Sequence, residues 1–299
     1  MCLSPVTLWR QYATKDGRKT DIVPCGKCVQ CLAKRRNDWA FRLYHQMMHS
    51  DTACFMTLTY GQQKERGVYQ WGENPPLSFN GNETLDKRHL QLFFKRLRKE
   101  NSRLLKDNDG ILSKNQKKLK YYAVGEYGTN FLRPHYHIIM FNLHSHLISR
   151  SFRVAKNIWQ KGSVDIAVCN IATINYVVGY LMQGSWTPLD DSDDRQPHYS
   201  TMSKGLGSQY LSDTVYNYHL DRMEIMVTHP SGFQMTMPRY YKKQVFSKEE
   251  LKEFEEIRQQ LFNVDWDDFV NIDRKLNLER DKRAIKKHEM NLKTNRVTL

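Results

Sequence analysis

Two histidines stand two residues apart in the run RPHYHIIMF, which covers residues 133–141. The rest of the run is apolar or aromatic, which predicts a β-strand. Alternate side chains of a strand share one face, so His135 and His137 should point the same way. Two imidazoles in this arrangement can bind one divalent ion, and the alternative is a pair of ordinary polar positions on a half-buried sheet.

Glu126 is the candidate third ligand. It lies at the end of the preceding predicted strand, nine residues before His135, where a hairpin would bring it alongside. A carboxylate among the ligands extends the choice of ion to Mg²⁺ or Mn²⁺.

Two tyrosines supply the second reactive group, in INYVVGYLMQ (residues 174–183). At about 100° per residue, a helix places Tyr176 and Tyr180 together, away from its apolar stripe. The stripe consists of Ile174, Val177, Val178 and Leu181. A tyrosine phenolate can act as a covalent nucleophile, and a nearby metal can position a phosphodiester for its attack. Simple surface tyrosines remain the alternative.

Cysteines gather near the N-terminus, in VPCGKCVQC. The candidate ligands are Cys2, Cys25, Cys28 and Cys31. Four thiolates can close a tetrahedral structural zinc site, three close cysteines also suit an iron–sulfur cluster, and free thiols are the third possibility. Cys54 and Cys169 lie in strand-like runs and are expected to be small buried residues.

The chain has 299 residues, 40% of them hydrophobic, and a formal net charge of +14. This length can bury a sizeable core. No apolar run approaches the roughly 18 residues of a membrane span, and the start MCLSPVTLWRQ lacks a signal-peptide core. We therefore expect an intracellular protein without a membrane partner.

The positive charge lies before the C-terminal tail, because residues 248–299 contain as many acidic as basic side chains. Two basic blocks stand out, residues 34–42 and residues 87–120. A basic body of this size favours nucleic acid as a partner, with a solvated basic surface as the alternative.

The hydrophobic pattern predicts an α+β protein with a mainly antiparallel sheet. Strands are expected at 53–60, 119–127, 133–141 and 163–170, with strand-like pieces near 223–228 and 232–237. Helices are expected at 32–49, 86–105, 149–160 and 171–183, and charged C-terminal helices at 247–262 and 266–290. Residues 61–85, 106–118 and 184–209 are expected to be loops.

The H-x-H strand followed by a Y-x3-Y helix resembles the HUH endonucleases of rolling-circle replication. The ordered set VPCGKCVQC, FMTLTY, GEYG, RPHYH, NYVVGY and MPRYY, spread over residues 1 to about 243, is similar to the replication initiators of small single-stranded DNA phages of the gokushovirus-like Microviridae.

This resemblance implies a ferredoxin/RRM-like central antiparallel sheet of about five strands flanked by helices. It implies Glu126, His135 and His137 as ligands of Mg²⁺ or Mn²⁺, and Tyr176 and Tyr180 as nucleophiles. The reaction would be nicking and rejoining of single-stranded origin DNA through a 5′-phosphotyrosine, leaving a 3′-OH primer. Related two-tyrosine enzymes often carry lysines where this chain has Gly179 and Gln183, so the grip on the phosphate is an open question.

The resemblance also implies a host helicase, a host DNA polymerase and the cytoplasm of a bacterial host. The expected organisation is a Cys-rich segment with a basic helix (1–50), the endonuclease domain (51–245) and a charged helical extension (246–299). Two other interpretations remain: a non-enzymatic nucleic-acid-binding module with structural zinc, and a metal hydrolase that uses water.

Substrate contacts are predicted from charge and aromatic content. The basic candidates for DNA binding are Lys34, Arg35, Arg36, Arg133 and Lys204. The aromatic candidates for base stacking are Tyr121, Tyr122, Tyr127 and Tyr136, for which packing in the sheet is the alternative.

Overall fold

The computed structural model describes residues 2–9, 20–61, 72–106, 118–128, 131–180, 192–222, 224–247 and 249–251. Contacts group the chain into two compact units, one of Met1–Tyr210 with His229–Gly232 and one of Leu211–Thr228 with Phe233–Leu299. The domain boundaries predicted after residues 50 and 245 stay predictions.

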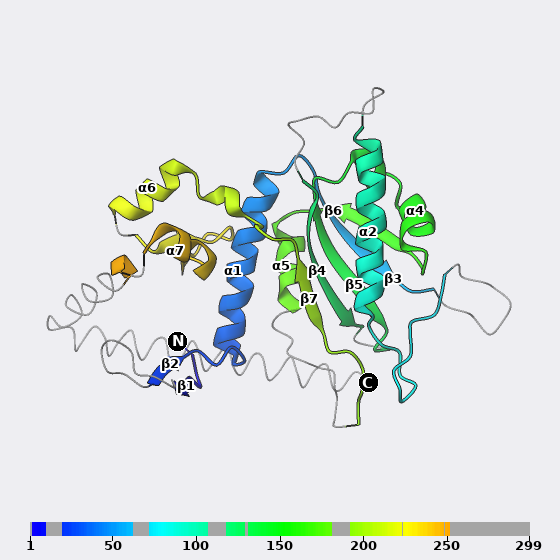
Figure 1. The fold of residues 1–299 in the computed structure, drawn as a ribbon, viewed down its shortest axis with the longest axis horizontal. Coiled ribbons are helices and arrows are strands. Elements are labelled where there is room, and N and C mark those ends of the chain that lie inside the picture. Colours follow the sequence, from blue (N-terminus) through cyan, green and yellow to red (C-terminus); the bar gives the residue numbers. More distant parts are fainter. Residues whose placement is uncertain are drawn as a thin grey trace. The chain divides into compact units, whose positions relative to one another are not determined.

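The first unit is built on a five-stranded antiparallel sheet (Figure 1). Its strands, in the order β6-β3-β5-β4-β7, are Val164–Val168, Ala53–Thr59, Pro134–Phe141, Lys120–Tyr127 and Tyr199–Met202. The predicted α+β class and the size of the sheet are confirmed.

Strand β7 corrects one expectation, because residues 184–209 were predicted to be a loop. Its sequence, YSTM, is short and mostly polar, so it carries little hydrophobic signal. It pairs along one edge of β4, with Gly125 opposite Tyr199. The edge strand therefore owes its place to backbone pairing with β4 rather than to an apolar pattern of its own.

One face of the sheet is covered by α2 (Lys87–Leu104), α3 (Ser145–Ile148), α4 (Ser151–Val154) and the π-helical turn Ala155–Trp159. Helix α2 begins where the Asp86 carboxylate accepts hydrogen bonds from the backbone N–H groups of Arg88 and His89, at 2.6 and 3.3 Å. Its apolar side, predicted from helical spacing, is buried. Burial of that stripe holds α2 against the sheet.

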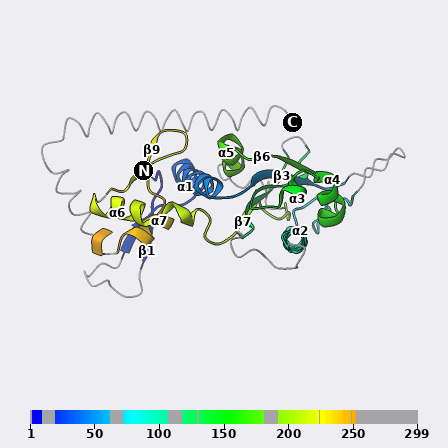
Figure 2. The ribbon, with the colours of Figure 1, turned by 90° about the horizontal axis from the view of Figure 1, so that it is seen from above.

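The opposite face is covered by α1 (Val29–Met48) and α5 (Ile171–Gly179); Figure 2 shows α5 and α2 on opposite sides of the sheet. On β5, Ile139 and Phe141 point to this second face and are fully buried in the core with α1 and α5. His135 and His137 continue the same alternate positions toward the start of the strand. The apolar stripe of β5 thus turns into a polar one beside α5.

The residue between the two histidines, Tyr136, points to the α2 side and is fully buried. Its hydroxyl donates to the backbone carbonyl of Asp86 at 2.9 Å, accepts from the Asp86 N–H at 3.0 Å, and lies 2.9 Å from the Tyr60 hydroxyl. These bonds connect β5 to the first turn of α2.

The base-stacking hypothesis is wrong for three of the four tyrosines in the sheet. Tyr122 and Tyr136 have no exposed surface and Tyr127 is 6% exposed, because helices cover both faces of the sheet. The ring of Tyr121 stacks on Phe94 at 3.7 Å. These side chains contribute to the core rather than to a binding surface.

A small antiparallel hairpin precedes α1 in the first unit, formed by β1 (Val6–Trp9) and β2 (Thr20–Val23). The second unit contains α6 (Asp213–Asp221), α7 (Arg239–Val245) and a hairpin of β8 (Met226–Thr228) and β9 (Gln234–Thr236). This hairpin confirms the two strand-like pieces expected there.

The charged helix predicted at 247–262 lies almost entirely outside the described residues, and that at 266–290 lies wholly outside them. Within the described ranges, no helix combines the length and the apolarity that crossing a bilayer requires.

Candidate active site

Glu126, His135 and His137 come together because of the register between β4 and β5. Glu126 is paired with His135 across the hairpin, and His137 follows two residues later on the same face. The Glu126 Oε1 atom lies 2.6 Å from His135 Nε2 and 3.0 Å from His137 Nε2. Two nitrogens and one carboxylate oxygen, all within 4.8 Å of one another, form a group that could hold a metal ion.

The far side of each imidazole is held by the sheet. His135 Nδ1 lies 3.0 Å from the backbone carbonyl of Arg133, and His137 Nδ1 lies 3.1 Å from Thr57 Oγ1. A carbonyl can only accept, so Nδ1 of His135 carries the proton there and Nε2 is directed at Glu126. Such outer hydrogen bonds fix the ring orientation and tautomer of metal-binding histidines.

The three side chains are strongly coupled. Burial tends to raise the pKa of the Glu126 carboxyl, but hydrogen bonds from the two imidazoles outweigh it, so that pKa is lowered. Burial tends to lower the pKa of His135, yet its hydrogen bond to Glu126 and the charge of that carboxylate raise it above its ordinary value. The site thus holds an anionic carboxylate 3% exposed to solvent, which favours a proton or a metal cation beside it.

Tyr176 and Tyr180 lie against this cluster. The Tyr176 hydroxyl is 3.4 Å from His137 Nε2, and the Tyr180 ring stacks on the His137 ring with centroids 5.3 Å apart. The two tyrosine rings meet edge to face at 5.1 Å. Both hydroxyl-bearing side chains therefore border the group that could hold an ion.

Helix α5 directs the tyrosines to this position. The Asn170 side chain accepts from the Thr173 N–H, and the Thr173 hydroxyl accepts from the Asn170 N–H, which forms a capping box. Ile174, Val177 and Val178 are fully buried on one side, whereas Tyr176 is 51% exposed. The expected separation of the tyrosines from the apolar stripe agrees with these positions; Leu181 and Gln183 lie outside the described residues.

The two tyrosines have different surroundings. Burial, followed by hydrogen bonding with Tyr176 and the charge of Glu126, raises the pKa of Tyr180 well above its ordinary value. Beside it, Gly179 has open space where a side chain would begin, with nothing within 4 Å of an added Cβ. Steric crowding therefore does not explain the glycine at this position.

Two residues of the site were missed from the sequence, Thr57 and His198. Thr57 is a β3 side chain directly opposite His137. His198 immediately precedes β7, and continuing the pairing of Gly125 with Tyr199 by one residue places it opposite Glu126. The alternation of His198, Ser200 and Met202 could have indicated the strand.

The imidazole of His198 is polar but unsatisfied. Both ring nitrogens are buried, and neither makes a hydrogen bond within the part of the chain that the structure describes. Burial lowers the pKa of His198, while the charge of Glu126 opposes this effect and that of His135 adds to it. The neutral ring is thus within electrostatic range of two members of the cluster.

The predicted DNA contacts do not gather into one group. Lys34 forms an exposed ion pair with Asp38 at 3.0 Å, Arg35 is exposed, and Arg36 lies 3.4 Å from the Asn37 amide oxygen. Lys204 is exposed in the turn after β7, and the Arg133 guanidinium donates to the backbone carbonyls of Tyr60 and Gly61. Their role in DNA binding stays a prediction.

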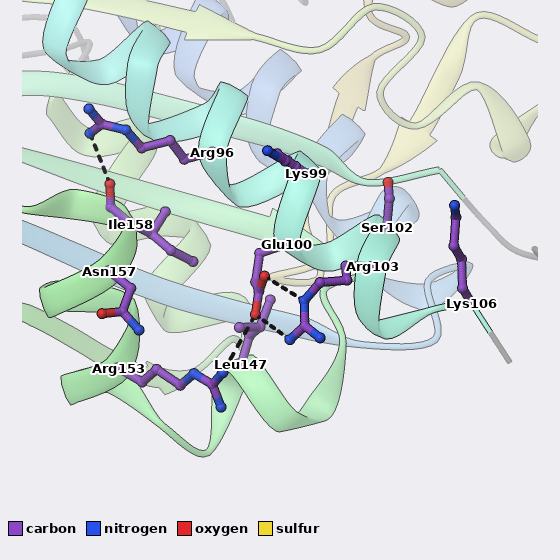
Figure 3. A pocket seen from close by; sticks show the side chains of 10 residues that line it. All are labelled: Arg96, Lys99, Glu100, Ser102, Arg103, Lys106, Leu147, Arg153, Asn157 and Ile158. Carbon is purple, nitrogen blue, oxygen red and sulfur yellow. Dashed lines mark hydrogen bonds and ion pairs between the residues drawn. The ribbon is translucent and has the colours of Figure 1, made fainter. Parts of the chain in front are cut away.

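A basic cavity of about 810 Å³ lies on the α2 side of the sheet, away from this cluster. Figure 3 shows it between α2 and the segment of Leu147–Ile158. Its lining consists of Arg96, Lys99, Glu100, Ser102, Arg103, Lys106, Leu147, Arg153, Asn157 and Ile158. Glu100 pairs with Arg103 at 2.8 Å and with Arg153 at 3.9 Å. Part of the basic block at 87–120 is therefore already neutralised here.

Residues 53–185 match the family model of the replication-associated protein ORF2. This range contains the Glu126, His135 and His137 cluster and both tyrosines.

Three curated proteins align with most of the chain. Replication-associated protein VP4 of Bdellovibrio phage phiMH2K is 26% identical over 73% of this chain and 65% of its own length. Replication-associated protein ORF2 of Spiroplasma virus 4 is 26% identical over 74% and 67%, and replication-associated protein ORF4 of Chlamydia phage 1 is 26% identical over 74% and 52%. The chain thus spans about two thirds of the first relative and half of the third. No solved structure gives a significant match.

Proposed function

We propose, on the premise that this chain belongs with the phage replication-associated proteins of the ORF2 family, that it nicks and rejoins single-stranded DNA to start rolling-circle replication. One observation supports this most. The hydroxyl of Tyr176, a half-exposed side chain, lies 3.4 Å from an imidazole of a three-ligand cluster. A nucleophile, a metal-binding group and an open side on which DNA can approach are thus in one place.

The proposed ion is Mg²⁺ or Mn²⁺, held by Glu126, His135 and His137. The donor set suits it, because two imidazole nitrogens and one anionic oxygen converge and leave other coordination positions free. Such an ion, when bound, supplies Lewis-acid polarisation of the scissile phosphate. Thr57 and the Arg133 carbonyl hold the two imidazoles in the orientation that binding requires.

The proposed reaction is an in-line exchange at phosphorus. The Tyr176 oxygen forms a bond to phosphorus, the bond from phosphorus to O3′ breaks, the phenol proton passes to solvent, and O3′ takes up a proton. The products are a 5′-phosphotyrosine and a free 3′-OH. Rejoining reverses these steps, with a 3′-OH attacking the phosphotyrosine and the phenol released.

We assign the first attack to Tyr176 and the second strand exchange to Tyr180. Tyr176 is 51% exposed and its hydroxyl contacts His137 directly. Tyr180 is harder to deprotonate in this arrangement, because burial raises its pKa. The alternation of the two nucleophiles would then begin with the one that is accessible and end with the one that is covered.

His198 is proposed to hold the phosphate in place of the lysines that related enzymes carry at positions 179 and 183. Its ring is buried and has no hydrogen-bond partner among the described residues. A neutral imidazole offers one N–H donor to a phosphate oxygen. This role explains why an unsatisfied polar group is retained beside Glu126.

The proposed DNA partner is the origin of the phage genome, and the proposed helicase and polymerase are those of the host. Arg35 and Lys204 are exposed in the first unit and could contact phosphates outside the reacting one. Binding through such contacts should weaken steeply with salt. The proposed place of action is the host cytoplasm.

A gel assay for a covalent protein–oligonucleotide adduct tests this function. The full chain is incubated with end-labelled single-stranded oligonucleotides that tile the encoding genome, with Mn²⁺ or with EDTA. One oligonucleotide should give a Mn²⁺-dependent adduct. Tyr176→Phe with Tyr180→Phe should reduce it by about 10³-fold or more, because no phenol remains to form the ester.

Tyr218→Phe is the matched control, since Tyr218 is 47% exposed on α6 and outside the cluster. An adduct of normal yield in the double variant would refute the nucleophile assignment. Cleavage without any adduct would indicate water as the nucleophile, and salt-sensitive binding without cleavage would indicate a non-enzymatic DNA-binding protein.

A further inference from the structure

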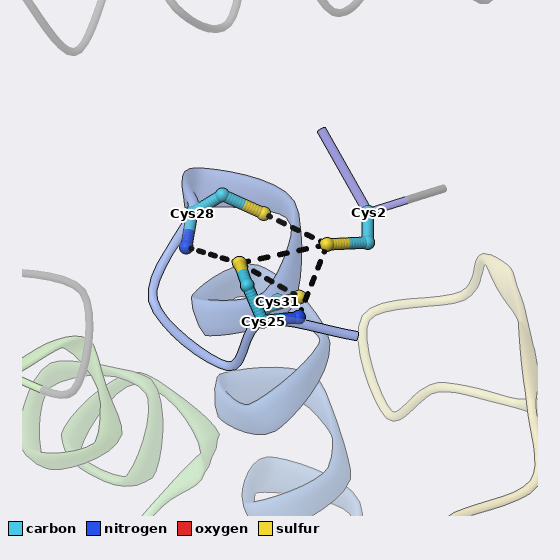
Figure 4. A group of neighbouring side chains, drawn as sticks. All are labelled: Cys2, Cys25, Cys28 and Cys31. Carbon is cyan, nitrogen blue, oxygen red and sulfur yellow. Dashed lines mark hydrogen bonds between the residues drawn. The ribbon is translucent and has the colours of Figure 1, made fainter. Parts of the chain in front are cut away.

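Four cysteine sulfurs converge at the start of α1, far from the tyrosines along the chain (Figure 4). Cys2 Sγ lies 3.5 Å from Cys25 Sγ and 3.7 Å from Cys28 Sγ. Cys25 Sγ lies 4.0 Å from Cys31 Sγ, and all four sulfurs are within 4.8 Å of one another. None of the four is in a disulfide.

These separations match one tetrahedral metal ion. Zinc–sulfur bonds of about 2.3 Å place the sulfurs of a tetrahedral site about 3.8 Å apart. A disulfide would require about 2.05 Å between two sulfurs. An iron–sulfur cluster holds several irons and sulfides between its cysteines and spreads them further than one ion does. The geometry therefore separates the three possibilities that the spacing alone left open.

Backbone N–H groups surround the sulfurs as they do around thiolates. The N–H of Leu3 donates to Cys28 Sγ at 3.5 Å, and that of Cys25 donates to Cys2 Sγ at 3.3 Å. Cys25 Sγ accepts from the N–H groups of Lys27 and Cys28, at 3.5 and 3.3 Å. Donors aimed at sulfur stabilise the anionic form, which is the form that binds metal.

The site also closes a hairpin that has little core of its own. Cys2 precedes β1 and Cys25 follows β2, while every residue of β1 is exposed, including Trp9 at 80%. A two-stranded hairpin with such exposure is marginal by itself. A shared ion would join both of its ends to Cys28 and Cys31 at the first turn of α1.

We propose that Cys2, Cys25, Cys28 and Cys31 bind one Zn²⁺ in a closed structural site that fixes the N-terminal hairpin to α1. Four protein ligands leave no coordination position for substrate, so the ion has no part in the chemistry. Its effect passes through α1, whose Ala40 and Leu43 pack with Ile174 and Val177 of the tyrosine-bearing helix.

Metal analysis of the purified full chain tests this site. Elemental analysis should give about one zinc per chain, and Co²⁺ exchanged for zinc should give the absorption of a tetrahedral tetrathiolate centre. Cys28→Ser should lose most of the metal. Cys169→Ser is the matched control, because Cys169 lies outside the group and should leave the zinc content unchanged.

Cys31→His provides a variant that keeps a fourth ligand and should retain zinc, which guards against loss of metal by misfolding. Iron with sulfide in place of zinc would overturn the proposal. So would metal-free protein, from cells grown with added zinc, in which the four thiols react freely with a thiol reagent. The readout is metal content, so it stands or falls separately from the covalent adduct.

Discussion

The two ligand groups of the first unit differ in almost every physical respect. The cluster of Glu126, His135 and His137 combines nitrogen and oxygen donors, and its carboxylate is 3% exposed. The four cysteines are all sulfur donors and all half-buried. The first group lies on regular strands next to a reactive side chain, and the second lies on loop and helix-start positions beside an exposed hairpin.

This difference teaches how ligand number and type separate chemistry from support. Three borderline or hard donors leave positions where a phosphate can bind, whereas four thiolates enclose an ion completely. Rigid strands set the first group, because a catalytic geometry tolerates little displacement. The cysteine group instead orders segments that would otherwise have little to hold them.

The largest expected effect breaks the comparison into its halves. His135→Ala with His137→Ala should reduce Mn²⁺-dependent cleavage by about 10³-fold or more, since only the carboxylate ligand remains. The zinc content of the same preparation should be unchanged. His89→Ala is a control on α2, outside the ligand group. Unchanged cleavage across a Mn²⁺ titration would exclude this metal site, and a joint loss of zinc would show that the two groups are not independent.

The second expected effect concerns the open side of the catalytic group. His198→Gln should lower the rate of adduct formation about tenfold at saturating DNA, because one hydrogen bond to the phosphate is lost in the transition state. The rate is measured in single-turnover experiments.

Position 179 provides the rescue. It has room for a side chain, so Gly179→Lys should restore part of the rate in the His198→Gln variant, and Gly179→Ala should not. Equal rates with and without His198 would show that the imidazole does not contact the phosphate.

The smallest expected effect is a pH-dependent change in thermal stability. The raised pKa of His135 means that a proton competes with the ion up to a higher pH than for a free histidine. The increase in Tm on adding Mn²⁺ should therefore be small near pH 5.5 and grow to a few degrees near pH 8, as measured by thermal scanning.

The metal-free protein should respond oppositely. A raised His135 pKa stabilises the fold below about pH 6.5 and this is lost as pH rises through the folded value. A lowered Glu126 pKa stabilises it above about pH 4.3 and this is lost as pH falls. In EDTA the pair should contribute most between these values. A Mn²⁺ effect that does not vary with pH would contradict the assignment of His135 as a ligand.

Sequence periodicity was sufficient where one element sets the geometry. The alternation of β5 placed His135 and His137 on one face, and the helical repeat placed Tyr176 beside Tyr180. Contacts between distant segments were less accessible, because pairing of β4 with β7 depends on backbone hydrogen bonds that leave no clear pattern in YSTM. His198 was missed for that reason. Cys2 could be named as a ligand, but only the hairpin geometry explains how a residue 23 positions away reaches Cys25.

Burial was the other quantity that single-sequence patterns could not assign. Tyr121, Tyr122 and Tyr127 alternate on β4 with both faces covered, so apolar and aromatic positions look alike whether they face α1 or α2. Which face holds the reactive group follows from the partners of the strand rather than from the strand itself.

The buried hydrogen bonds of Tyr136 have a consequence for how this region can tolerate insertions. A strand that slips by one residue exchanges its two faces, which would bring Tyr136 to the metal group and send both histidines into the core against α2. The three contacts of its hydroxyl with Asp86 and Tyr60 oppose that exchange. Changes of loop length between β4 and β5 should therefore be absorbed within the turn, and the spacing of the histidines should be the last feature of this hairpin to drift.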